Sequence, residues 1–208
     1  SVYNPTPFMS HISYNPILSF AIYLVMYELL LQKDISRIKM FFYSFFALTM
    51  SINMFITGGR AGQIMYFAVI LILSIQFFNK NKIKAIISSA IIIPTIFFIA
   101  YNSSAIFNER VDLTVKNVIN YSENRDSSVG TRITYAINSW EIIMSNPVLG
   151  VGTGDFPTEH NKINKINSPE VLDTKNPHNM YILVLTQLGL LGLISFLSIF
   201  YAQLKFAF

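Results

Sequence analysis

Charged side chains are scarce in this chain of 208 residues, since Asp, Glu, Lys and Arg together make up only 12%. Soluble domains average about 25% charged residues. Apolar residues reach 52%, the mean hydropathy is +0.47, and stretches such as 61–78 and 83–100 carry charge only at their ends, if at all. Such stretches need lipid or protein around them on every side, so the sequence indicates an integral membrane protein.

Cysteine is absent altogether. Its absence excludes a disulfide framework, zinc or iron–sulfur sites with cysteine ligands, and a thiol nucleophile. The acidic residues of the long polar segment are scattered and the three histidines lack metal-ligand spacing, so the sequence predicts neither a metal site nor a cofactor. The chain starts at Ser1 in a polar stretch without a signal-peptide pattern, from which we expect a fragment of a longer protein.

Windows of about 20 apolar residues predict five membrane-spanning helices, near residues 16–31, 37–57, 61–78, 83–101 and 180–204. We therefore expect an all-α, polytopic membrane helix bundle with a large helical extracytoplasmic loop between the last two spans. Its expected parts are transmembrane helices with short turns over 1–101, an extracytoplasmic (periplasmic) loop with amphipathic helices over 102–178, and a final transmembrane helix over 179–208.

Positive charge orients the expected bundle. Of the 15 Lys and Arg residues, six lie in two short turns between spans: Lys33, Arg37, Lys39, Lys80, Lys82 and Lys84. The positive-inside rule places these turns in the cytoplasm. Alternation of the spans then puts the N-terminus, the 57–60 turn and the polar segment 102–178 on the opposite face. The net charge of +4, distributed in this way, indicates contact with membrane lipid and not with nucleic acid.

The polar segment 102–178 is too long for a simple connection, and we expect it to be functional. Within it, apolar residues recur at helical spacing, namely Ile133, Ala136, Ile137, Trp140, Ile143 and Met144. This spacing predicts an amphipathic helix over 131–146, capped by Thr131, on the membrane surface or on the ends of the spans. Residues 161–175 are rich in Asn, Lys and Ser without periodicity, which predicts a mobile lid or a surface excursion.

Two arginines are candidates for binding a phosphate group. Arg60 lies in Thr-Gly-Gly-Arg-Ala-Gly at the start of a span, where glycines allow close backbone approach and a helix N-terminus adds amide groups. Arg132 repeats this arrangement at the start of the 131–146 helix. Each also fits a simpler role, Arg60 as a side chain that reaches lipid head groups and Arg132 as an ordinary solvated helix start.

His178 is a candidate base at the point where the loop re-enters the membrane, between Pro177 and Asn179. A neutral imidazole there can accept a proton from an incoming hydroxyl, because the ordinary histidine pKa of about 6.5 leaves the ring mostly unprotonated at neutral pH. A polar contact with head groups is the simpler alternative for His178, and we assign His11 and His160 to that role.

A glycine-rich stretch, Gly150-Val-Gly152-Thr-Gly154, follows a helix and a proline. A dinucleotide-binding loop must instead follow a strand and open a helix within a βαβ unit. The stretch therefore predicts a tight turn with positive φ angles.

Taken together and in order, these motifs resemble the O-antigen ligase and polymerase superfamily over roughly residues 52–197. They are Thr-Gly-Gly-Arg-Ala-Gly before a span, Thr131-Arg132 opening a helix that contains tryptophan, the stretch from Asn146 to Phe156, and Pro177-His-Asn-Met-Tyr181 running into Gln187-Leu-Gly-Leu-Leu-Gly192. Each motif is weak alone, whereas the combination is specific. Members of the superfamily are longer, with additional spans.

The resemblance implies a glycosyltransferase in the bacterial inner (cytoplasmic) membrane with its active site on the periplasmic face. It would move a glycan from an undecaprenyl-diphosphate carrier to an acceptor hydroxyl on lipid A core, glycan or protein. The family's basic residues map onto Arg60 and Arg132 and its histidine onto His178. We expect Asn179, Gly150 and Gly152 to support this site, while Gln187 stands where the family commonly has Glu.

Three other functions stay open at this point. An O-antigen or exopolysaccharide polymerase and a protein O-oligosaccharyltransferase share the same motifs and differ in the acceptor. A membrane transporter subunit would instead have ionisable residues or broken helices near the middle of the bilayer. The spans 61–78 and 83–101 have no charged residue in their middles, and Pro94 alone is a weak break.

Overall fold

The structure is a computed structural model that describes residues 9–207 and is all helical across them, without a strand. Five helices are long and apolar enough to cross a membrane: α1 (His11–Leu31), α2 (Arg37–Ile56), α3 (Arg60–Phe77), α4 (Lys82–Ser103) and α8 (Met180–Ala207). The predicted all-α fold class with five candidate spans is thus confirmed, and the extracytoplasmic side of the long loop stays a prediction. Residues 1–8, expected on the outer face, and the side chain of His11, expected at head groups, lie outside the described part.

Polar residues decide where the spans begin. Ser10 Oγ accepts a hydrogen bond from the amide of Ile12 at 3.2 Å, so α1 begins ahead of Pro16, where the apolar window starts. Ser36 and Asn81 cap α2 and α4 with their side-chain oxygens. Such oxygens satisfy amides that no helix carbonyl can reach. Hydrophobicity therefore located the spans, and the caps set their first residues.

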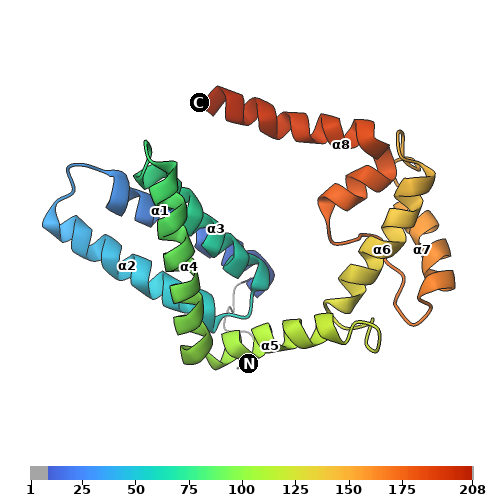
Figure 1. Cartoon of the computed structure of the whole chain (residues 1–208), viewed down its shortest axis with the longest axis horizontal. Helices are drawn as coiled ribbons and strands as arrows, with labels where there is room; N and C mark the ends of the chain where they lie inside the picture. The colour runs from blue at the N-terminus through green and yellow to red at the C-terminus, as the bar shows by residue number, and fades with distance from the viewer. Residues whose placement is uncertain (1–8, 208) are drawn as a thin grey trace. The chain divides into compact units, whose positions relative to one another are not determined.

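The first compact unit, Ser1–Leu113, holds α1 to α4 and the first part of α5 (Ala105–Ile119). In this unit α1 packs against both α2 and α3, and α4 packs against α3 (Figure 1). Its core consists of buried side chains from these helices: Leu18, Ile22, Met54, Phe55, Tyr66, Ala100 and Phe107. The ring of Phe55 meets the rings of Tyr66 and Phe107 edge-to-face, with centroids 5.4 and 5.0 Å away, which ties α2 to α3 and α5.

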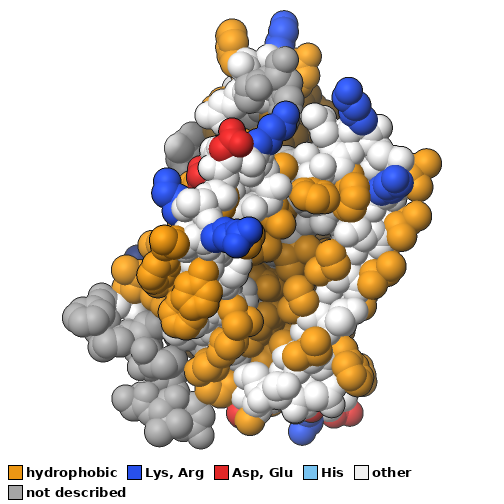
Figure 2. All heavy atoms as spheres, turned by 90° about the vertical axis from the view of Figure 1, so that its left-hand side faces the viewer, with side chains coloured by type: hydrophobic (Ala, Val, Ile, Leu, Met, Phe, Trp, Pro, Cys, Tyr) orange, Lys and Arg blue, Asp and Glu red, His pale blue; other side chains and the backbone are white. Residues whose placement is uncertain are grey.

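The basic turns lie at one end of this unit. The α1–α2 and α3–α4 turns are at the same end, and the α2–α3 turn is at the other (Figure 1). Figure 2 shows one face of the molecule, on which most of the Lys and Arg side chains lie towards the upper end, above a broad area of hydrophobic side chains. An apolar surface bordered by positive charge suits a membrane. The side of the membrane that the basic end faces remains a prediction.

The second compact unit, Thr114–Phe208, combines the remainder of α5 with α6 (Gly130–Ser145), α7 (Phe156–Asn167) and α8. Within it α6 packs against both α7 and α8. The helix predicted over 131–146 is therefore present. Its buried face is mostly polar and also contains Ile143 of the predicted apolar face, whereas Ile137, Trp140 and Met144 are exposed. The position of this helix on a membrane surface stays a prediction.

Residues 161–175, predicted to form a mobile lid or a surface excursion, contain the end of a helix that the sequence did not predict. The first part of this stretch belongs to α7, which turns Phe156, His160 and Asn164 towards its neighbours as fully buried side chains. Only one of these three residues is a typical core residue. Hydrophobic periodicity therefore gave no sign of a helix, although the i, i+4, i+8 spacing places all three on one face.

The last span is interrupted at Gly189, whose φ of 62° and ψ of −164° are not helical. Figure 1 shows the resulting sharp bend in α8. Backbone hydrogen bonds to segment 147–152 close the break: Leu190 N to Pro147 O at 2.9 Å, Leu191 N to Val148 O at 3.3 Å, and Val151 N and Gly152 N to Thr186 O and Gln187 O, each at 2.9 Å. A break inside a membrane-spanning helix requires partners of this kind, because lipid offers no hydrogen bonds.

Candidate functional site

Arg60 is the first residue of α3 and is half-buried. The turn before it is held by α1, because Thr57 Oγ1 donates to Asn15 Oδ1 at 2.7 Å and Asn15 Nδ2 donates to Gly59 O at 3.3 Å. Gly59, the N-cap residue, has no side chain to accept from the first amides of the helix. The arginine therefore stands on a fixed turn at the positive end of a helix dipole.

Gly62 of the same motif serves helix packing. A Cβ at Gly62 would lie 2.3 Å from the Cβ of Asn15, so no side chain fits where α3 crosses α1. Ser19 Oγ also donates to Gly62 O at 2.7 Å. This glycine allows close approach of another helix, whereas the sequence interpretation expected the glycines of the motif to admit a ligand.

Arg110 on α5 is a basic residue that the sequence interpretation missed. A Cβ at Gly58 would lie 3.4 Å from Nε of Arg110, so the guanidinium packs against the 57–60 turn. The turn that carries Arg60 thus has a second arginine beside it. No local pattern marks Arg110, because the contact depends on how α5 follows α4.

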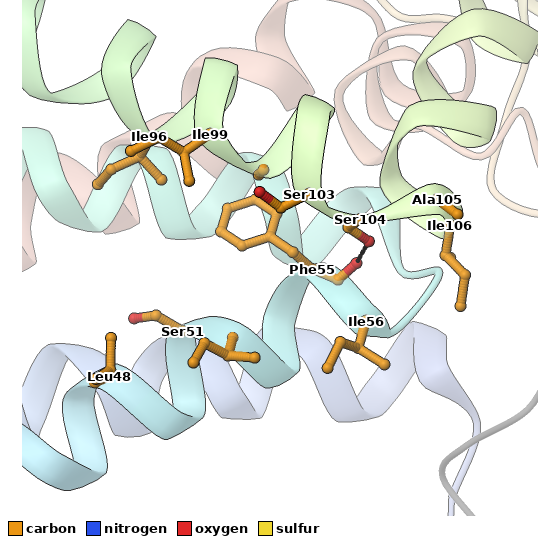
Figure 3. Close-up of a pocket in the computed structure, with 12 residues that line it drawn as sticks. Leu48, Ser51, Phe55, Ile56, Ile96, Ile99, Ser103, Ser104, Ala105 and Ile106 are labelled. Atoms are coloured by element: carbon orange, nitrogen blue, oxygen red, sulfur yellow. Dashed lines mark hydrogen bonds between the residues drawn. The ribbon is translucent and has the colours of Figure 1, made fainter.

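An apolar cavity of about 560 Å³ lies between α2 and the α4–α5 junction (Figure 3). Its lining includes Ile52, Ile56 and Ile99, together with the hydroxyls of a few serines. At one end Ser104 Oγ donates to Phe55 O at 2.7 Å, which joins the two walls. Ile56 directly precedes the Thr57–Arg60 turn in sequence, so the cavity reaches the level of that turn.

Arg132 is exposed in the first turn of α6. The helix begins at Gly130, and Ser127 Oγ accepts from the Gly130 amide at 3.0 Å. The prediction that Thr131 caps this helix is wrong, since its hydroxyl donates to Ser127 O at 3.1 Å from inside the helix. The side chain of Arg132 is presented to solvent by a well-anchored helix start.

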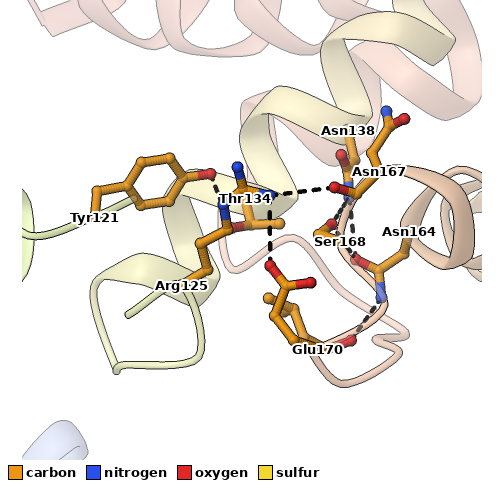
Figure 4. A network of polar contacts seen from close by, with 9 residues as sticks. Tyr121, Arg125, Thr134, Asn138, Asn164, Asn167, Ser168 and Glu170 are labelled. Carbon is orange, nitrogen blue, oxygen red and sulfur yellow. Dashed lines mark hydrogen bonds and ion pairs between the residues drawn. The ribbon is translucent and has the colours of Figure 1, made fainter. Parts of the chain in front are cut away.

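A polar network joins α6 to α7 and to the loop that leads to His178 (Figure 4). Asn138 Nδ2 donates to Asn164 Oδ1 at 3.1 Å and to Ser168 Oγ at 3.0 Å. Asn164 Nδ2 in turn donates to Val171 O at 2.7 Å. All these side chains are buried, so their hydrogen bonds are required for the folded loop.

His178 has an unusual backbone, with a φ of 56°. Its amide donates to Asn176 Oδ1 at 2.8 Å, and Asn179 Oδ1 accepts from the amides of Tyr181 and Ile182 at 2.9 and 3.2 Å. Asn179, the expected supporting residue, is therefore the cap of α8. His178 is exposed, and its ring stacks on Tyr135 with centroids 6.2 Å apart and planes inclined by 24°.

The expected head-group contact of His160 is wrong, because this residue is fully buried in α7. Its ring lies between Phe156, stacked at 5.0 Å, and Tyr135, edge-on at 5.4 Å. Within the described part of the chain, neither ring nitrogen has a hydrogen-bond partner. Desolvation by burial lowers the pKa of His160 below its ordinary value, so the ring is neutral at neutral pH.

The glycine-rich stretch forms the predicted turn, with φ angles of 69° at Gly150, 111° at Gly152 and 89° at Gly154. A Cβ at Gly150 would lie 2.4 Å from the backbone carbon of Gln187, and one at Gly189 would lie 2.2 Å from Val148 O. These glycines let the turn and the broken α8 touch backbone to backbone. The expected support of the site by Gly150 and Gly152 stays a prediction.

A family model described as O-Antigen ligase matches residues 45–197, which is well over half of the chain. The chain belongs to the O-antigen ligase family. As a member of this family it is a multi-pass membrane enzyme of glycan transfer, of the ligase or polymerase type. No curated protein and no solved structure matches the chain.

Within this family member the candidate residues fall in two places. Arg132 and His178 belong to the second unit, where α6 carries Arg132 and also carries Tyr135, which touches His178. Arg60 belongs to the first unit. Across residues 9–207, no group of three or more His, Cys, Asp or Glu side chains is placed to hold a metal ion.

Proposed function

We propose that this O-antigen ligase family member transfers a glycan from an undecaprenyl-diphosphate carrier to an acceptor hydroxyl. The family match over residues 45–197 carries the proposal, because the matched range contains both candidate arginines and His178. The acceptor belongs to the class of lipid A core, glycan or protein hydroxyls. The reaction takes place on the periplasmic face of the inner membrane, which is the face that the positive-inside rule assigns to the 102–178 segment.

Arg60 and Arg132 have the task of stabilising the leaving group. Breaking the sugar–phosphate bond develops negative charge on the diphosphate, and fixed guanidinium groups stabilise that charge most in the transition state. Arg60 stands on a turn fixed by Asn15, and Arg132 is exposed on a helix start anchored by Ser127. Both side chains are thus carried by rigid backbone, which favours electrostatic catalysis without reorganisation.

His178 has the task of accepting the proton of the attacking hydroxyl. The acceptor oxygen bonds to the anomeric carbon as the carbon–oxygen bond to the diphosphate breaks, and the hydroxyl proton moves to the imidazole. A single displacement of this kind inverts the anomeric centre. Exposure of His178 supports the role, since an acceptor can reach the ring from solvent.

The apolar cavity beside the α4–α5 junction suits the isoprenoid chain of the carrier. Its walls are mostly aliphatic, and its lining includes Ile56, which directly precedes the turn that carries Arg60. A carrier with its chain in this cavity would have its diphosphate near the guanidinium. Because two arginines supply the positive charge, transfer should persist in the presence of a chelator.

The test is transfer by the purified full-length protein in liposomes, with undecaprenyl-diphosphate-linked glycan as donor and rough lipopolysaccharide as acceptor probe. Wild-type protein should release undecaprenyl diphosphate and glycosylate the probe. Arg60→Lys and Arg132→Lys should both lose transfer, because a lysine lacks the planar fork that binds phosphate oxygens in pairs. Arg125→Lys is the matched control, since Arg125 pairs with Glu170 at the surface.

Two results would contradict this function. One is full transfer by both lysine variants of Arg60 and Arg132. The other is the absence of any carrier-linked glycan consumption by wild-type protein when glycan or protein acceptors replace the lipopolysaccharide probe.

A further inference from the structure

Tyr135 lies at the centre of a column of four rings in the second unit. The ring of His178 stacks on it at 6.2 Å, and the ring of His160 meets it edge-on at 5.4 Å, with an interplanar angle of 80°. Phe156 continues the column by stacking on His160 at 5.0 Å. Tyr135 itself is only 6% exposed, so His178 is the one solvent-exposed member of the column.

The hydroxyl of Tyr135 also holds the loop that leads to His178. It donates to Leu172 O at 3.0 Å. One residue earlier, Val171 O accepts from buried Asn164, and two residues later the amide of Thr174 donates to Asn161 Oδ1 at 3.1 Å. The loop is therefore attached to α6 and α7 at successive points up to the Asn176 turn that sets the backbone of His178.

An exposed imidazole can rotate about two side-chain bonds, and a base that rotates freely is seldom aligned with its substrate. The positive φ of His178 fixes where the ring starts, and the flat face of Tyr135 restricts where the ring can go. Tyr135 is three residues after Arg132 on α6, so both side chains lie on neighbouring positions of one helix surface.

We propose that Tyr135 is a positioning residue for the transfer reaction. It aligns the imidazole of His178 towards the acceptor hydroxyl, and through α6 it sets the spacing between that imidazole and Arg132. Tyr135 does not itself touch substrate. The inference rests on the proposed function, since it assigns Tyr135 to the base of that reaction.

The test compares Tyr135→Phe and Tyr135→Leu in the full-length protein. Phenylalanine keeps the ring face and loses only the hydrogen bond to Leu172 O, so its kcat should fall by no more than about threefold, which is within the effect of losing one neutral hydrogen bond. Leucine removes the ring, and kcat should fall by about tenfold to a hundredfold with the KM for carrier unchanged. Ile142→Ala, also buried on α6, is the control for general loss of packing and should leave kcat nearly unchanged.

A double-mutant cycle separates positioning from a structural role. If Tyr135 acts through His178, the Tyr135→Leu substitution should cause no further loss in a His178→Ala protein. Multiplying losses in the double variant would overturn the inference. So would a Tyr135→Phe protein as slow as Tyr135→Leu, or a folded Tyr135→Leu protein with wild-type kcat.

One measurement does not depend on how the leucine variant folds. The ring protons of His178, assigned by NMR with His178→Ala, should show an upfield ring-current shift in wild type and in Tyr135→Phe. Random-coil shifts in both would overturn the inference. An active His178→Ala protein would instead refute the proposed base and leave the ring contact itself intact, so the two failures are distinguishable.

Discussion

Asn138 and Asn164 share a buried hydrogen bond, in which Nδ2 of Asn138 donates to Oδ1 of Asn164 at 3.1 Å. Through it the helix that carries Arg132 is joined to α7 and to the loop before His178. Both side chains are about 1% exposed. A buried amide that loses its partner cannot turn to water instead, so this contact is important for the second unit.

Asn138→Ala should lower the free energy of unfolding by about 1–3 kcal/mol, because Asn164 Oδ1 and Ser168 Oγ each lose a buried donor and keep only the hydrogen bond between them. Thermal unfolding of the full-length protein in detergent measures this loss. Asn167→Ala is the matched control, since Asn167 is exposed and donates to Glu141 at the surface; its change should stay within about 0.5 kcal/mol. Equal stabilities of the two variants would contradict the role of the network.

Gly189→Ala should destabilise the protein strongly, through two effects. The backbone angles at this position are essentially restricted to glycine, a strain of about 1–3 kcal/mol for any other residue. The added Cβ would also lie 2.2 Å from Val148 O. Gly154→Ala separates the two effects, because Gly154 also has a positive φ but open space around it. Stability and folded yield in detergent should therefore fall more for Gly189→Ala than for Gly154→Ala. An equal or smaller fall would show that the backbone of segment 147–152 is not closely packed against Gly189 of α8.

Stability should depend on pH through His160. Burial holds its pKa in the folded protein below the value of 6.5 that it has when exposed. Below pH 6.5 the unfolded chain therefore binds a proton at this histidine more readily than the folded protein does. The contribution of His160 to the free energy of unfolding is fully present above this pH and is lost as the pH falls below it. Unfolding midpoints measured from pH 7.5 to 5 should fall for wild type and fall less for His160→Phe, which keeps a ring between Phe156 and Tyr135. Parallel pH profiles of the two proteins would exclude His160 as the cause.

The sequence predicted those parts of the fold that depend on local composition. The spans are long apolar runs, and the glycine-rich stretch needs positive φ angles, so both could be identified without tertiary contacts. The break at Gly189 escaped notice because leucines flank it and continue the apolar run. α7 was missed because its buried face consists of one aromatic residue with a histidine and an asparagine.

The candidate site shows the same limit. Arg60, Arg132 and His178 could be named from motifs that are continuous in sequence. Tyr135 and Arg110 could not, since each is recognised only by what it touches: the ring of His178 in one case and the backbone of Gly58 in the other. Contacts between residues so distant in sequence leave no local pattern.

Single cysteines test the proposed topology, because the chain contains no cysteine. Lys165 and Lys82 are both exposed, the first on α7 and the second at the start of α4. In intact spheroplasts an impermeant thiol reagent should label Lys165→Cys and not Lys82→Cys, if the 102–178 segment faces the periplasm. The opposite labelling would invert the topology and remove the proposed chemistry on the outer face.

The central claim is that the arginines bind the diphosphate while His178 accepts the proton, and the transfer rate of a His178→Ala protein tests it most directly. In full-length protein saturated with carrier-linked glycan, the single-turnover rate should fall by about 10²- to 10⁴-fold while carrier binding is retained. A folded, membrane-inserted His178→Ala protein that transfers glycan at nearly the wild-type rate would contradict the account.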